Sequence, residues 1–130
     1  MTRYSTVVLE HFRNPRNVGT IENADGVGEI GDPECGDFIR VFVKVEDDIV
    51  TDVKYLIKGC PASIACASAM TELAIGKNLD DAMMITDDDI VKELDGLPEF
   101  KIHCSALGAT ALQKAIINYF INYASKGREG

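Results

Sequence analysis

The chain lacks the sequence patterns of several common protein classes. Its 130 residues hold four cysteines, too few for a disulfide-stabilised domain, and no paired C-x-x-C motif of the zinc-ribbon type. No apolar run approaches the roughly 18 residues that a membrane helix needs, and the first residues show no signal-peptide pattern. We therefore expect a cytoplasmic protein with no membrane association, whose cysteines serve as thiols or metal ligands.

Positive charge is also scarce. The sequence has 13 lysines and arginines against 21 aspartates and glutamates, which gives a formal net charge of −8. Because nucleic acids and anionic membranes are bound through clustered lysine and arginine, this composition argues against both kinds of partner. It is better suited to a cationic partner or a basic protein surface.

The length and the apolar periodicity predict a single α+β domain over residues 1–130, with a flexible tail over about residues 126–130. We find no internal repeat and no low-complexity linker. The fold class is a small antiparallel β-sheet packed against helices. The expected helices cover about residues 4–13 and 62–74, a segment that starts at Thr86, and residues 103–125; the expected strands cover residues 27–30, 38–45 and 49–57, the last two forming a hairpin.

Three well-separated cysteines are the candidate functional residues. Cys35 lies in a loop rich in glycine and proline, whereas Cys60 and Cys104 lie at or near expected helix starts. The free N–H groups of a helix start stabilise a thiolate, which is the form that binds soft metals and attacks sulfur. Asp37 and His103 stand next to two of these cysteines and could add a ligand, so the pattern predicts a metal or cluster site assembled by folding.

Each of these residues also has a purely structural explanation. The three cysteines could be buried small side chains, although loops and helix starts are poor places for core residues. Asp37 could only organise its loop, and His103 could only cap a helix. Cys66 lies in the middle of a helix, about 120° away from Cys60 around the axis, and is expected in the core.

The sequence resembles the iron–sulfur cluster assembly scaffold family, which comprises IscU and the N-terminal domain of NifU. The resemblance runs from residue 3 to about residue 125. It is carried by Tyr4-Ser5, Asn14-Pro15-Arg16-Asn17-Val18-Gly19, Glu34-Cys35-Gly36-Asp37, Gly59-Cys60, Ser63-Ile64-Ala65 and Lys101-Ile102-His103-Cys104-Ser105, in the family's order.

The resemblance implies a function as a scaffold rather than an enzyme. Such a protein builds a transient 2Fe–2S cluster from iron and from the sulfur of a cysteine desulfurase, and passes it to apo iron–sulfur proteins. Cys35, Cys60 and Cys104 correspond to the cluster cysteines, Asp37 to the aspartate that keeps the cluster labile, and His103 to the neighbouring histidine. Cys104 is our expected persulfide acceptor. Tyr4 matches a tyrosine linked in the family to dimer contacts, so a homodimer is possible.

Two departures from the family pattern matter. Leu97-Pro98-Glu99-Phe100-Lys101 replaces the Leu-Pro-Pro-Val-Lys motif that a chaperone recognises in bacterial IscU, which puts a dedicated chaperone in doubt. Cys66 stands where relatives usually have serine. The segment between Cys60 and Cys104 looks too short for the SufU branch, which carries an insertion there.

Two other functions are compatible with parts of this pattern. Cys35, Asp37 and Cys60, with His103 or Cys104, would equally suit tetrahedral zinc in a SufU-like sulfurtransferase. A cysteine hydrolase that uses Cys104 and His11 is the weakest alternative, because the chain has only two histidines and no orienting motif is evident. His11 itself is expected at the surface or its boundary.

Overall fold

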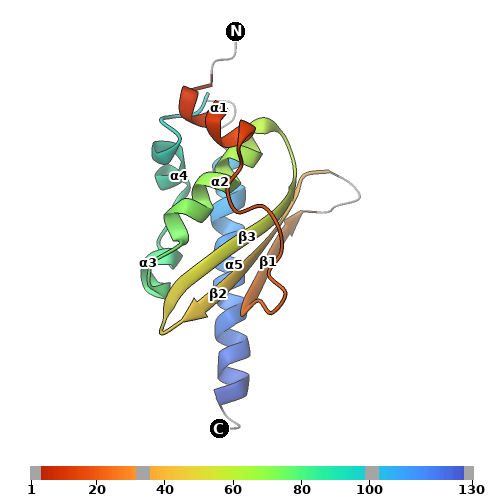
Figure 1. Cartoon of the computed structure of the whole chain (residues 1–130), viewed down its shortest axis with the longest axis vertical. Helices are drawn as coiled ribbons and strands as arrows, with labels where there is room; N and C mark the ends of the chain where they lie inside the picture. The colour runs from red at the N-terminus through yellow and green to blue at the C-terminus, as the bar shows by residue number, and fades with distance from the viewer. Residues whose placement is uncertain (1–3, 32–35, 99–102, 128–130) are drawn as a thin grey trace.

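A three-stranded antiparallel sheet forms the centre of the protein (Figure 1). The computed structural model describes residues 4–31, 36–98 and 103–127. The strands are β1 (Gly26–Gly31), β2 (Phe38–Glu46) and β3 (Ile49–Lys58), and β2 lies between the other two. The predicted α+β class and all three predicted strands are confirmed.

The hairpin between β2 and β3 closes through two aspartates. Asp47 and Asp48 both have positive φ angles, 52° and 62°. Two consecutive residues of this conformation match the right-handed twist of the strands they join, and aspartate tolerates it better than most side chains. Glu46 therefore pairs directly with Ile49, and the turn is one residue shorter than the acidic triplet in the sequence implied.

Five helices complete the described fold: α1 (Thr6–Arg13), α2 (Pro61–Ala74), α3 (Leu79–Met83), α4 (Asp87–Glu93) and α5 (His103–Gly127). Helix α4 starts after Thr86, as predicted, and Thr86 forms a capping box with Asp89. The short helix α3 was not predicted. The long helix α5 continues to Gly127, two residues beyond the expected end, while residues 128–130 lie outside the described part. No helix in that part is both long and apolar enough to cross a bilayer.

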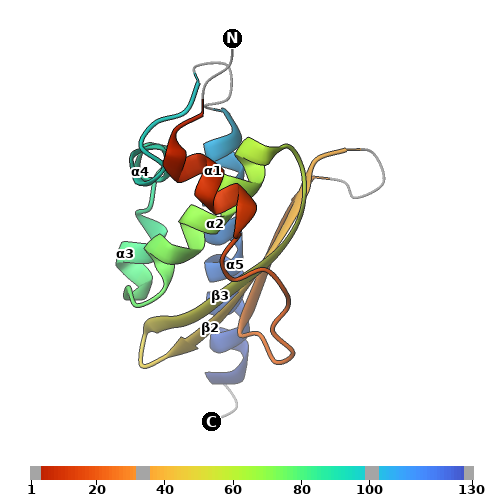
Figure 2. The same ribbon diagram turned by 45° about the horizontal axis from the view of Figure 1, so that its top comes forward.

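Helix α5 runs along the sheet because two glycines of β1 let it approach closely (Figure 2). A β carbon on Gly28 would collide with the backbone of Ala111 and Ala115, and one on Gly26 would collide with the carbonyl oxygen of Ala115. Helix α5 contributes Ala111 and Ala115 to this contact, so the backbone of α5 packs directly on the backbone of β1. This packing fixes where the first turn of α5, which carries Cys104, stands relative to the other helices.

Helix α1 is attached to α2 by a buried polar network, not only by apolar packing. His11 is 4% exposed, and the expectation that it lies at the surface or its boundary is wrong. Its Nδ1 lies 2.7 Å from the hydroxyl oxygen of Ser68, and its Nε2 lies 3.4 Å from a carboxylate oxygen of Glu72. Because both ring nitrogens have partners, the imidazole can be buried without losing its hydrogen bonds.

Candidate functional site

Two cysteines far apart in the sequence meet at the starts of two helices. Cys60 is the N-cap residue of α2, followed by Pro61 at the first helical position, as predicted. Cys104 is the second residue of α5. Their sulfur atoms lie 3.8 Å apart, and no disulfide joins them. Folding therefore brings these two predicted site residues together.

The surroundings of Cys60 favour its thiolate. Partial burial raises its pKa, but this is outweighed by the hydrogen bonds that stabilise the charged sulfur, from the Ser63 side chain and backbone, from Cys104 and from the backbone of Ala62, so the pKa lies below its ordinary value. The Ser63 hydroxyl is 3.4 Å from the sulfur. A thiolate in a partly exposed position is the form of cysteine that binds metal and reacts with sulfur donors.

The distance between the two sulfurs fits a shared metal ion. Two thiolates bound to one tetrahedral ion at about 2.3 Å lie about 3.8 Å apart. Cys60 and Cys104 have this separation without any rearrangement. The same geometry suits iron and zinc, because both ions accept tetrahedral thiolate ligands.

Asp37 lies just before β2, next to the turn that leads into Cys60. The ladder pairs Phe38 with Lys58, which brings the preceding Asp37 opposite Gly59, the residue before Cys60. The carboxyl carbon of Asp37 is 3.9 Å from the position of a β carbon on Gly59. Asp37 is exposed to solvent. Its carboxylate is therefore next to the Cys60 turn and open to exchange with water.

The other predicted site residues are only partly described. Cys35 lies outside the described residues, and of His103 the structure gives the backbone, which begins α5. Among the residues whose side chains are described, no group of three or more histidines, cysteines or acidic residues forms a compact ligand set. The described part of the site is thus the thiol pair with Asp37 nearby.

Cys66 is a buried core residue, as its position in the middle of a helix predicted, and its thiol differs chemically from the pair. Its side chain is fully buried in the core. Burial, together with the negative charges of the Cys104 and Cys60 thiolates, raises its pKa to about 12. A thiol with this pKa stays protonated near neutral pH, so Cys66 is neither a nucleophile nor a ready ligand.

Sequence reasoning gave Ser63 no role of its own. It occupies the third position of α2 after its N-cap, where a side chain can turn back toward the capping residue. Its hydroxyl contacts the Cys60 sulfur. The cysteine at the N-cap followed by serine three positions later was the available signal.

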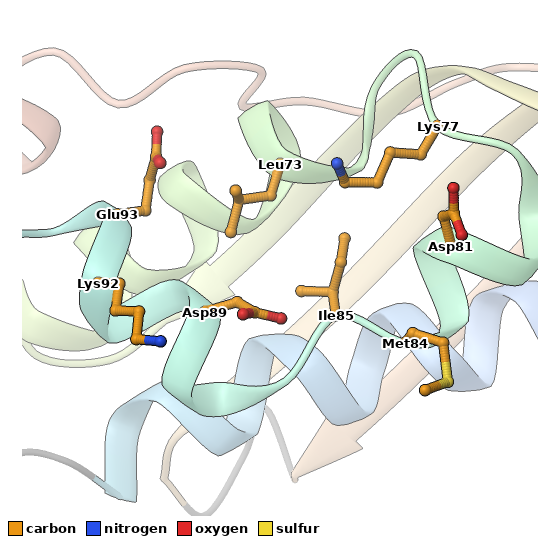
Figure 3. Close-up of a pocket in the computed structure, with 8 residues that line it drawn as sticks. All are labelled: Leu73, Lys77, Asp81, Met84, Ile85, Asp89, Lys92 and Glu93. Atoms are coloured by element: carbon orange, nitrogen blue, oxygen red, sulfur yellow. The ribbon is translucent and has the colours of Figure 1, made fainter.

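A cavity of about 430 Å³ lies elsewhere, between α2, α3 and α4 (Figure 3). Charged side chains such as Lys77, Asp81 and Lys92 surround the apolar Leu73 and Ile85. No cysteine or histidine lines it. Its only soft donor is the thioether of Met84, and the candidate site remains the thiol pair.

A family model described as the NifU-like N terminal domain matches residues 3–126. The chain is 50% identical over 117 residues to iron–sulfur cluster assembly scaffold protein IscU 1 of Archaeoglobus fulgidus, covering 90% of this chain and 76% of that protein. It is 44% identical over 120 residues to the scaffold protein IscU of Escherichia coli strain K12, covering 89% and 93% of the two chains.

A solved structure is also similar. It is described as an iron–sulfur cluster assembly scaffold protein for the SUF system from Fervidobacterium islandicum AW-1. The TM-score is 0.71 at 26% sequence identity, covering 87% of this chain and 96% of that one. The fold and the thiol pair together define a domain of the iron–sulfur scaffold type. The chain belongs to the NifU-like N-terminal domain family.

Proposed function

We propose that this chain is a scaffold on which an iron–sulfur cluster is assembled before transfer to other proteins. The observation that carries the proposal is the 3.8 Å separation of the Cys60 and Cys104 sulfurs. The relatives from Archaeoglobus fulgidus and Escherichia coli support it, because both are named iron–sulfur cluster assembly scaffold proteins.

The cluster in this proposal is cargo of the 2Fe–2S type. Cys35, Cys60 and Cys104 supply three thiolates, and Asp37 or His103 supplies the fourth ligand. A set of three thiolates and one harder ligand holds a cluster less firmly than four thiolates, because iron in a sulfide cluster favours soft donors. This weaker binding suits a protein that must give the cluster away.

Sulfur reaches the site, in our proposal, as a persulfide from a cysteine desulfurase. We assign the acceptor to Cys104, because the start of α5 favours its thiolate. Cys60 is the competing acceptor, since it is more exposed than Cys104 and its pKa is lowered. Mass spectrometry of peptides after incubation with desulfurase and cysteine decides between them, and added sulfur found mainly on Cys60 would reverse the assignment.

The remaining parts of the proposal concern setting and partners. The protein acts in the cytoplasm, receives sulfur without catalysing a reaction of its own, and delivers clusters to apo iron–sulfur proteins. The altered segment before His103 argues against a dedicated chaperone. Tyr4, which precedes α1, supports a homodimer only by its match to the family pattern.

Anaerobic reconstitution with iron and sulfide tests the scaffold function. The expected result is a coloured protein with visible charge-transfer bands and two irons per site. After incubation with apo-ferredoxin and separation of the two proteins, the cluster should be found on the ferredoxin. The competing function is a zinc-dependent sulfurtransferase, which the spacing of the two thiols also fits, because zinc takes tetrahedral thiolate ligands. A colourless protein that holds one tightly bound zinc would establish that alternative and refute the scaffold function.

A further inference from the structure

The last turns of α5 carry an apolar stripe that faces away from the sheet. Ile117, Phe120, Ile121 and Ala124 follow one another at intervals of three and four, so they share one side of the helix; we refer to these four residues as the α5 stripe. The opposite side of the same turns faces the sheet, where the backbone of Tyr119 lies against Gly26 and the Asn122 side chain donates a hydrogen bond to the backbone carbonyl of Asp25.

The stripe is open to solvent. Ile117 is 46% exposed, Phe120 44% and Ile121 62%. Figure 1 shows that the C-terminal end of α5 extends beyond the sheet. An apolar stripe at helical spacing is normally buried against another element, and a contiguous exposed one marks an interaction surface.

The stripe is distant from the thiol pair. Helix rise places Ile117 about 20 Å along α5 from Cys104. The surface can therefore be altered without touching the candidate ligands, and its role can be tested independently of the scaffold function.

The border of the stripe is acidic on the side of Phe120. Asp48, from the hairpin turn, and Asp80, from α3, line a hollow of about 190 Å³ together with Phe120. Within the described part of the chain, neither carboxylate forms an ion pair. Lys114 lies three residues before Ile117, at the N-terminal end of the stripe, and its backbone is close to Gly28 of β1.

We propose that the α5 stripe is a docking surface for a partner protein that presents an amphipathic helix with an apolar face bordered by lysine or arginine. The apolar faces pack by ridges into grooves, and the basic border of the partner meets Asp48 and Asp80. The acidic border makes a second copy of this chain a poor occupant, because two-fold pairing through the stripe would bring acidic residues of both copies together in a protein whose net charge is −8.

Two synthetic helical peptides with the same leucine stripe test this proposal, one with lysine and one with glutamate on either side of the stripe. Fluorescence anisotropy measures the binding of each to the full chain. We expect the lysine peptide to bind about tenfold more tightly than the glutamate peptide. The double variant Ile117→Ser/Ile121→Ser should bind neither, and Asp48→Asn/Asp80→Asn should remove most of the difference between the peptides.

Met84→Ser is the matched control, because it removes an apolar side chain that is 73% exposed outside the stripe. It should bind both peptides as the unchanged protein does. Circular dichroism verifies that each variant is folded. Equal binding of the two peptides, or unchanged binding in the Ile117/Ile121 variant, would overturn the proposal. A concentration-dependent dimer that this variant abolishes would also overturn it, by identifying a second copy as the occupant.

Discussion

The sulfur atoms of Cys60 and Cys104 lie 3.8 Å apart although 44 positions separate the residues in sequence. This contact exists because α2 begins directly after β3, and α5 is held against β1 with its first turn beside that point. The site is thus built by the packing of helices on the sheet, and its chemistry can be tested by changes at the thiols and at the packing contacts.

The first prediction concerns ligand identity. Cys60→Ser and Cys104→Ser should each abolish stable cluster binding, because each removes one of two thiolates spaced for the same ion. Cys35→Ser should do the same if that cysteine completes the set. Cys66→Ser should leave most of the cluster, since its thiol is buried and protonated. Visible absorbance after anaerobic reconstitution measures each outcome, and equal loss in Cys66→Ser would place Cys66 in the site.

Alkylation kinetics should report the lowered pKa of Cys60. Its reaction with iodoacetamide should reach half its maximal rate at a lower pH than that of an unperturbed cysteine, because only the thiolate reacts. Ser63→Ala removes a hydrogen bond to the sulfur, so the midpoint should move to higher pH. Peptide mass spectrometry separates the Cys60 signal from those of the other cysteines, so Cys104 can be left in place. A midpoint unchanged by Ser63→Ala would show that the serine does not stabilise the thiolate.

Cluster lifetime should depend on Asp37. Its carboxylate is an exposed, hard oxygen donor beside the Cys60 turn, where it admits water and incoming thiols to a soft cluster. Asp37→Ala should therefore lengthen the life of a bound cluster and slow its transfer to apo-ferredoxin. The decay of visible absorbance without acceptor measures the lifetime, and the cluster recovered on ferredoxin after separation of the two proteins measures the transfer rate. Faster decay in Asp37→Ala would mean that Asp37 only organises its loop.

The close packing of β1 on α5 should make Gly28 intolerant of any side chain. Gly28→Ala forces a methyl group into the backbone of Ala111 and Ala115, and overpacking of this kind costs about 1–3 kcal/mol. Gly36→Ala is the control, because a β carbon there meets no atom within 4 Å. Urea denaturation compares the free energies of unfolding. Equal stability of the two variants would contradict the close approach.

Stability should fall in mild acid because of His11. Burial of the ring, helped by the positive charge of Arg16 and opposed by Glu72, lowers its pKa from 6.5. The unfolded chain then binds a proton more readily than the folded chain, so this contribution is complete above pH 6.5 and is lost as the pH falls toward the folded pKa. Urea midpoints measured from pH 8 to pH 5 should decline, and less steeply in His11→Gln. Parallel declines in both proteins would assign the effect to other groups.

The elements that local sequence determines were predictable. The apolar periodicity of α1, the capping box of Thr86 and Asp89, and the cysteine-proline start of α2 each depend on residues a few positions apart. Helix α3 was missed because its five residues bury only Leu79 and Ala82, too short a pattern for periodicity to detect.

Features that depend on distant partners could not be read from the sequence. The burial of His11 requires Ser68, 57 positions away, and neither residue alone indicates the other. The sequence identified Cys60 and Cys104 as candidates, but their separation depends on how α5 lies on β1. The glycines that permit this approach looked like ordinary strand residues, because nothing in β1 itself shows which helix will cross it.

The convergence of two helix starts has a further consequence for the energetics of loading. Each helix start carries roughly half a positive charge, so the N-termini of α2 and α5 repel each other where Cys60 and Cys104 meet. An anionic occupant would neutralise both ends at once and pull the helices together. Loading should therefore rigidify the junction of α2 and α5, and release should return that junction to a state of mutual repulsion. The same electrostatic arrangement would therefore favour binding of an anionic cluster, and would separate the two helix N-termini again after the cluster is released.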